Sequence, residues 1–149
     1  MIPDFVDIDS LWSVLPHGVH EATLEEVEAR FATSTHRKHL FSGFKDGAML
    51  LHKAGCRRIL LDGSFVTAKP IPGDYDACWD PASVNPKLVD PILLDFSDRR
   101  KRQKACFHGE FFPSTVNADR QHCFSDFFQI DKYTGNAKGI ICIRFLKCQ

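Results

Sequence analysis

The spacing of apolar residues changes at Gly55, and this change limits the classes of fold that the chain can adopt. Before Gly55, apolar residues recur every three or four positions, which predicts one helix over residues 23–33 and a second over residues 37–54. Thr23 and Glu26 form a capping-box pattern at the start of the first helix, and Gly55 supplies the stop of the second. After Gly55 the apolar runs are short and are separated by Gly, Pro and Asp, which is typical of strands. Helices followed by such strands predict an α+β domain with a small mixed β-sheet flanked by helices.

The elements expected after Gly55 are short, and they end in a turn before a final strand. We expect strands over residues 57–61, 74–79, 107–112 and 139–146, short helices over residues 86–94, 99–106 and 124–130, and a turn at residues 134–136. We expect residues 1–149 to form a single domain, with residues 1–16 as an irregular arm. The 13 phenylalanines predict a core in which aromatic rings pack on one another.

The charge and the apolar runs exclude several classes of protein. The 19 basic and 19 acidic side chains give a net charge of zero, so no overall field draws the chain to nucleic acid or to an anionic membrane. No apolar run is long enough to span a membrane, and Asp4, Asp7 and Asp9 stand where a secretory signal would be basic. The six cysteines form no CxxC pair. Together these features predict a cytoplasmic protein with reduced thiols.

The segment most informative about function runs from residue 60 to residue 80. A strand leads into a turn at Gly63 and Ser64, where glycine lets a ligand approach the backbone and serine adds a hydroxyl and an N–H group. After a gap of nine residues, Asp74 opens the next expected strand, with Asp76 two positions later. Alternate residues of a strand point to the same face, so both carboxylates should project together while Tyr75 points to the other side. Two carboxylates beside such a turn suit a divalent metal and a nucleoside triphosphate.

This pattern of Gly-Ser, nine residues and Asp-hydrophobic-Asp resembles the signature of the polymerase-β-like nucleotidyltransferase superfamily, particularly its small minimal members. The wider sequence also resembles a small bacterial family assigned to that superfamily, in the stretches LPHGVHEATLEEVEARFAT, DPILLDF through QKACFHGEFFP, and DFFQIDKYTGNAKGI. The wider resemblance runs from about Leu15 onward, whereas the superfamily motif covers only about twenty residues. The resemblance implies a minimal nucleotidyltransferase-like fold.

The resemblance also implies a site and a reaction. Gly63 and Ser64 would hold the terminal phosphates of a nucleoside triphosphate, and Asp74 and Asp76 would bind Mg²⁺, with Mn²⁺ as the alternative metal. A nucleoside monophosphate would pass to a hydroxyl of a protein, RNA or small-molecule acceptor, and pyrophosphate would leave. A third carboxylate completes the metal site in the superfamily, and Glu110 in FHGEFF is the best match. The substitute for Glu110 is Asp95 in ILLDF.

Two features of the sequence support other interpretations. The loop before Asp74 carries two prolines, and Gly73 stands where many relatives have a serine. The alternative function is therefore a catalytically silent binding module with the same fold, such as one component of a toxin–antitoxin or phage-defence pair. The basic run over residues 99–104 reads first as a solvated helix face. Lys104 is the member that could reach the triphosphate, and the run could also contact a nucleic-acid acceptor.

Two pairs of histidines have a spacing that could suit a metal ion. His36 and His39 have a spacing that would bring their rings together on a helix, and His17 and His20 share it. No cysteine or carboxylate pattern completes either pair, so the sequence does not predict a zinc site.

Overall fold

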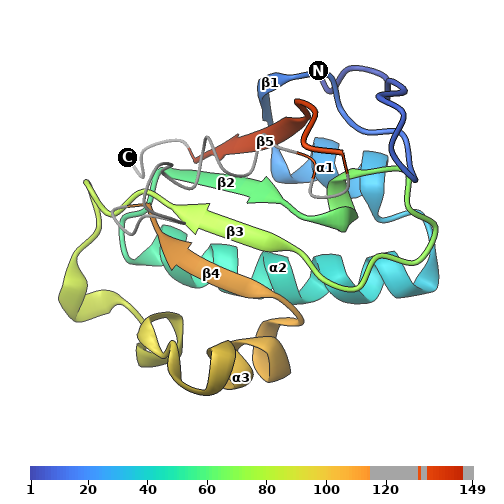
Figure 1. Cartoon of the computed structure of the whole chain (residues 1–149). Coiled ribbons are helices and arrows are strands. Elements are labelled where there is room, and N and C mark those ends of the chain that lie inside the picture. The colour runs from blue at the N-terminus through green and yellow to red at the C-terminus, as the bar shows by residue number, and fades with distance from the viewer. Residues whose placement is uncertain (115–130, 132–133, 146–149) are drawn as a thin grey trace.

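One mixed β-sheet organises the protein, shown in Figure 1 as a computed structural model that describes residues 1–114, 131 and 134–145. Within these residues the sheet has the strand order β1-β5-β2-β3-β4. The strands are β1 (Gly18–Ala22), β2 (Arg58–Asp62), β3 (Asp76–Trp79), β4 (Glu110–Pro113) and β5 (Gly139–Arg144). β1 is parallel to β5 and β3 is parallel to β4, whereas β2 is antiparallel to both of its neighbours.

Two helices cover one face of the sheet, and a third lies beside the edge strand β4 (Figure 1). The covering helices are α1 (Leu24–Phe31) and α2 (Thr35–Lys53), and the third is α3 (Ser97–Phe107). This arrangement confirms the predicted α+β fold with a mixed sheet flanked by helices. No helix among the described residues is long and apolar enough to cross a membrane.

The two N-terminal helices begin and end close to the predicted positions, because short-range signals set both. Thr23 and Glu26 form the expected capping box at the start of α1. The side chain of Ser34 accepts a hydrogen bond from the backbone N–H of Arg37, so α2 begins two residues earlier than predicted. Gly55 follows α2 with a φ of 102°, a left-handed conformation that glycine adopts without strain.

The helix predicted over residues 86–94 is wrong. Two separate 3₁₀ turns occupy this stretch, η2 (Pro86–Leu88) and η3 (Pro91–Leu94). Proline cannot donate a backbone hydrogen bond, and it favours an extended conformation in the preceding residue. Asp90 is extended in this way, with a ψ of 130°, so a continuous helix cannot pass Pro91.

Two further strand boundaries differ from the predictions, and one strand was not predicted. The strand expected over residues 107–112 begins only at Glu110, because α3 continues to Phe107 and His108 ends it in a left-handed conformation. The strand expected over residues 139–146 ends at Arg144, and β1 was not predicted at all. Gly135 lies in the expected turn and donates its N–H to the carbonyl of Asp131. The helix predicted over residues 124–130 lies outside the described residues.

Aromatic rings fill the core between α2, α3 and the sheet, as the phenylalanine content predicted. The ring of Phe44 stacks on that of Phe111, with centroids 6.0 Å apart, and meets the ring of Tyr75 edge-on at 5.3 Å. Tyr75 is fully buried, and its hydroxyl donates a 2.6 Å hydrogen bond to the carbonyl of Phe107. Tyr75 therefore fixes the chain just before β3 against the end of α3.

Gly43 allows α2 to approach the end of α3. A Cβ atom at Gly43 would lie 2.0 Å from the carbonyl oxygen of Phe107, which is backbone and cannot rotate away. We expect Gly43→Ala to lower the free energy of unfolding by about 2 kcal/mol, because the overlap outweighs the better helix propensity of alanine. Urea unfolding measures this change. Gly73→Ala is the matched control, since no atom lies within 4 Å of its Cβ position; equal midpoints for the two variants would contradict the expected overlap.

Candidate carboxylate site

Three carboxylates lie side by side on adjacent strands. Asp76 in β3 pairs with Asp62 of β2 on one side and with Glu110 of β4 on the other. These residues alternate with residues of the helix-covered core, so they lie on the opposite face of the sheet. The same face carries a smaller buried cluster made of Leu60, Cys78, Phe112, Ile140 and Cys142. We call Asp62, Asp76 and Glu110 the carboxylate row.

Asp76 lies at the centre of this row, and its pKa is strongly raised. Burial is the largest cause, since it disfavours the ionised carboxylate. The negative charges of Asp62, Asp74 and Glu110 add to the effect, as does a hydrogen bond with the Glu110 side chain. The pKa of Asp76 rises to about 7. The row can therefore hold a proton near neutral pH, in the hydrogen bond between Asp76 and Glu110.

A lysine beside β5 balances the first carboxylate of the row. The ammonium group of Lys138 lies 3.0 and 3.2 Å from the two carboxylate oxygens of Asp62. Asp62 is only 4% exposed. Burial raises the pKa of Asp62, while Lys138 and the backbone N–H of Gly63 act in the opposite direction. Lys138 thus joins the segment before β5 to the end of β2.

Two basic residues of α3 hold the third carboxylate. Lys104 Nζ lies 2.9 Å from one oxygen of Glu110, and the guanidinium of Arg100 lies 3.3 Å from the other. The Arg100 guanidinium also lies 4.2 Å from the centre of the Phe112 ring. Asp98, Arg99 and Arg100 adopt left-handed dihedral angles inside α3, a conformation that costs energy for residues other than glycine. The predicted basic helix is therefore bent where Arg100 contacts Glu110.

The turn at Gly63 and Ser64 directly follows the first carboxylate. Gly63 has a φ of 96°, and a Cβ atom there would lie 3.0 Å from the Cα of Tyr75. Glycine is therefore needed both for the turn and for its close approach to the segment before β3. Ser64 begins a single 3₁₀ turn, η1 (Ser64–Val66), and its carbonyl accepts a hydrogen bond from the Thr67 hydroxyl.

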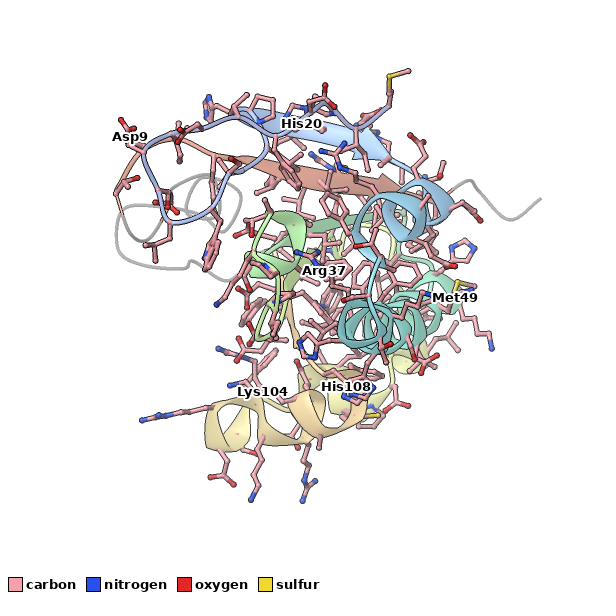
Figure 2. All side chains as sticks on the ribbon, turned by 90° about the vertical axis from the view of Figure 1, so that its right-hand side faces the viewer. Asp9, His20, Arg37, Met49, Lys104 and His108 are labelled. Atoms are coloured by element: carbon pink, nitrogen blue, oxygen red, sulfur yellow. The ribbon has the colours of Figure 1, made fainter. Side chains whose placement is uncertain are left out.

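Arg37 of α2 fastens this turn to the rest of the molecule, and Figure 2 shows it in the interior. Its guanidinium donates hydrogen bonds to the carbonyl oxygens of Phe65, Thr67 and Lys69 at 2.7, 2.8 and 2.6 Å. A fourth bond, of 3.2 Å, reaches the carbonyl of Phe31. Arg37 is only 6% exposed. The position of the Gly63–Ser64 turn therefore depends on a buried side chain that the sequence did not single out.

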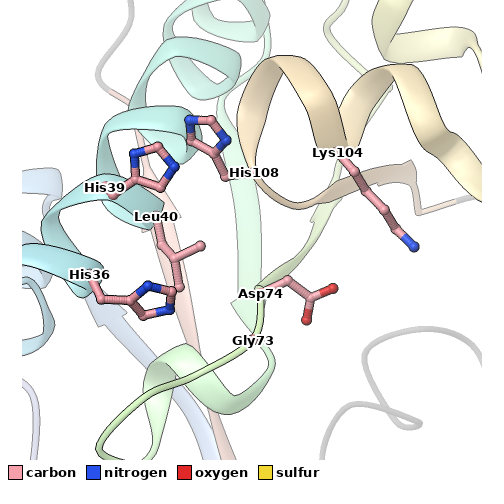
Figure 3. A pocket seen from close by; sticks show the side chains of 7 residues that line it. All are labelled: His36, His39, Leu40, Gly73, Asp74, Lys104 and His108. Atoms are coloured by element: carbon pink, nitrogen blue, oxygen red, sulfur yellow. The ribbon is translucent and has the colours of Figure 1, made fainter.

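Asp74 lies outside β3, which corrects the predicted strand over residues 74–79. β2 ends at Asp62 and its chain turns at Gly63, so β3 has no antiparallel partner before Asp76. Asp74 instead lines a pocket of about 350 Å³ with Gly73 and Lys104 (Figure 3). Its other lining residues are His36, His39, Leu40 and His108. The rings of His39 and His108 stack with centroids 3.8 Å apart.

The structure brings together most of the residues that the sequence suggested for the site. Asp76 contacts Glu110, and Glu110 contacts Lys104. Asp95, the substitute for Glu110, instead pairs with Arg102 and accepts hydrogen bonds from Ser97. The additional members, absent from the predicted site, are Asp62, Lys138, Arg100 and the three histidines of the pocket.

The donor atoms of this site suit a hard divalent cation. Asp74, Asp76 and Glu110 offer only carboxylate oxygens, which Mg²⁺ prefers. Among the described residues, no group of three or more His, Cys, Asp or Glu side chains is arranged so that it could hold a metal ion. Glu110 is held by Arg100 and Lys104, so it would have to exchange these partners in order to coordinate a metal.

The sheet, the carboxylate row and the adjacent pocket define an α+β protein with an acidic site at one end of three neighbouring strands. The profile of a family of unknown function, DUF6932, matches residues 6–144, and the chain belongs to this family. Neither the curated proteins nor the solved structures contain a significant match.

Proposed function

We propose that the protein is a metal-dependent nucleotidyltransferase that moves a nucleoside monophosphate from a nucleoside triphosphate to an acceptor hydroxyl. The observation that supports this proposal is the carboxylate row of Asp62, Asp76 and Glu110, whose first member, Asp62, is directly followed in the chain by the turn at Gly63. The acceptor is a protein, an RNA or a small molecule. We place the reaction in the cytoplasm, a compartment in which cysteine thiols stay reduced.

Once Glu110 has exchanged Arg100 and Lys104 for the metal, the carboxylates of Asp74, Asp76 and Glu110 would hold Mg²⁺, or Mn²⁺ as the alternative. A bound divalent metal would neutralise negative charge on the triphosphate and would lower the pKa of the attacking hydroxyl. Asp76 must lose its proton before it can coordinate, because only the ionised carboxylate is an effective ligand. The acceptor hydroxyl releases its proton to solvent and its oxygen bonds to the α-phosphorus, while the bond from the α-phosphorus to the bridging oxygen breaks and pyrophosphate leaves with that oxygen.

The remaining roles belong to the residues around the row. Gly63 lets a phosphate approach the backbone, and Ser64 offers its hydroxyl and N–H as donors. When Glu110 turns to a metal, Lys104 is released and can pair with a phosphate oxygen of the nucleotide. The pocket beside Asp74 leaves room for the part of a substrate that adjoins the phosphates.

Calorimetric titration with Mg²⁺ and a non-hydrolysable nucleoside triphosphate tests this assignment. We expect binding that requires Mg²⁺ and that Asp76→Asn weakens at least about tenfold, since a neutral amide is a poor metal ligand. Asp4→Asn is the matched control, because Asp4 is exposed in the N-terminal arm. Labelled triphosphates with candidate acceptors then test transfer. Unchanged affinity and unchanged transfer for Asp76→Asn would show that the metal assignment is wrong.

A second candidate is a silent binding module with this fold, such as one half of a toxin–antitoxin or phage-defence pair. The observation that favours it is the pairing of Glu110 with two cations, which already satisfies the carboxylate. This candidate predicts that a stable protein partner copurifies with the chain and that Mg²⁺ with nucleotide produces no heat. Micromolar nucleotide binding would contradict it.

A further inference from the structure

A second cavity, of about 290 Å³, lies at the start of α2 and is lined by positive charge. Three cationic side chains contribute to its wall, those of Arg30, Arg37 and Lys69. No Asp or Glu lines the cavity among the residues that the structure describes. The cavity shares no lining residue with the carboxylate row or with the histidine-lined pocket.

The positive charge in this cavity has no carboxylate partner within the described part of the chain. The hydrogen bonds of the Arg37 guanidinium all go to backbone carbonyls, although the side chain is only 6% exposed. Burial is the one cause that lowers the pKa of Arg37, consistent with the lack of an acidic neighbour. Arg30 lies over the ring of Phe5, with its guanidinium carbon 4.5 Å from the ring centre. A buried cation without a counter-charge is costly, and a bound anion would offset that cost.

The backbone at the start of α2 also favours the binding of an anion in this cavity. Thr33 and Ser34, which precede the first turn of α2, also line the cavity. Ser34 caps one N–H of this 19-residue helix, but the first turn contains no acidic residue, so no carboxylate neutralises the partial positive charge of the helix start. The cavity therefore combines three cations, two hydroxyl groups and the positive end of a helix.

We propose that this cavity binds the phosphate group of a small molecule. A phosphate carries up to two negative charges and several acceptor oxygens, and it matches three cations better than a single carboxylate does. The volume admits a phosphate with a small organic group, for which the ring of Phe5 supplies an apolar contact. Because Arg37 also holds η1, a phosphate bound beside Arg37 would stabilise the Gly63–Ser64 turn through this side chain. The site does not depend on the proposed transferase activity.

Calorimetry and thermal unfolding of the whole chain with inorganic phosphate test this proposal. We expect saturable binding at one site, a rise in the melting temperature and weaker binding at high salt. Lys69→Gln and Arg30→Gln should each weaken phosphate binding about tenfold, since each removes one charge-assisted contact. Lys53→Gln, an exposed position at the other end of α2, is the matched control and should bind as the wild type does.

Further variants distinguish phosphate binding in this cavity from phosphate binding at the carboxylate site. Asp76→Asn and Lys104→Gln should leave phosphate binding unchanged, because neither residue lines the cavity. Circular dichroism checks that Arg30→Gln and Lys69→Gln are folded. The proposal is overturned by the absence of saturable binding, by equal binding of acetate, or by unchanged affinity in both Lys69→Gln and Arg30→Gln. Loss of phosphate binding in Lys104→Gln would overturn it too, since the anion would then occupy the other site.

Discussion

Replacing Arg37 with methionine is expected to lower the free energy of unfolding by about 3–5 kcal/mol. Methionine has a similar reach but cannot donate a hydrogen bond, so the carbonyls of Phe31, Phe65, Thr67 and Lys69 all lose a donor. The Phe65 and Thr67 bonds involve buried residues, where an unsatisfied carbonyl costs about 1–3 kcal/mol. Loss of the buried cation itself recovers part of this energy, which keeps the net effect below the sum of the lost bonds.

Urea unfolding followed by circular dichroism measures this change. Arg37→Lys should lie between the wild type and Arg37→Met, because one ammonium cannot span four carbonyls as the planar guanidinium does. Lys53→Met controls for removal of a cation from the exposed face of the same helix. Hydrogen exchange should also speed up in η1 when Arg37 is replaced. A loss below about 1 kcal/mol for Arg37→Met would contradict the structural role of these bonds.

The helices could be predicted because their signals are local. The capping box at Thr23 and the stop at Gly55 act within one turn of the helices that they bound. The predicted alternation puts Tyr75 and Asp76 on opposite faces, and they do lie so, with Tyr75 in the helix-covered core, although both Asp74 and Tyr75 precede β3. β1 escaped prediction because its segment GVHEA has few residues with strong strand preference. Its parallel partner β5 lies near the other end of the sequence.

The carboxylate row could not be predicted, because it depends on which residues of neighbouring strands pair, and the sequence alone does not show this register. The strand predicted over residues 57–61 stops before Asp62, although Asp62 continues the alternation from Leu60 and stands directly before Gly63. Its significance follows only from its pairing with Asp76 across the antiparallel β2 and β3. Arg37 was missed for a different reason, since an arginine in an amphipathic helix usually lies in solvent and only the folded chain supplies its carbonyl partners.

The raised pKa of Asp76 gives a second large effect, on the pH dependence of stability. In the unfolded chain this carboxyl has its usual pKa of 3.8, whereas in the folded protein the pKa is about 7. Between these values the folded state binds more protons than the unfolded state, so the free energy of unfolding falls as the pH rises. The contribution of Asp76 is complete below pH 3.8 and is lost as the pH passes through about 7. At pH 8 the folded protein therefore holds an ionised carboxylate in an unfavourable environment.

Asp76→Asn should remove this penalty and raise the free energy of unfolding at pH 8 by about 2–4 kcal/mol in metal-free buffer. The asparagine amide can donate to Glu110, as the protonated Asp76 carboxyl does, so the hydrogen bond in the row survives. Urea unfolding at pH 5 and pH 8 measures the effect: the variant should gain stability at both pH values but clearly more at pH 8, because the wild-type loss is only partly complete at pH 5. Asp4→Asn should leave the wild-type pH dependence in place. Equal gains at both pH values would show that the stabilisation does not come from the titration of Asp76. A gain that is larger at pH 8 than at pH 5, in the same variant that loses metal-dependent nucleotide binding, would show that the carboxylate is kept at a cost to stability because the site requires its charge.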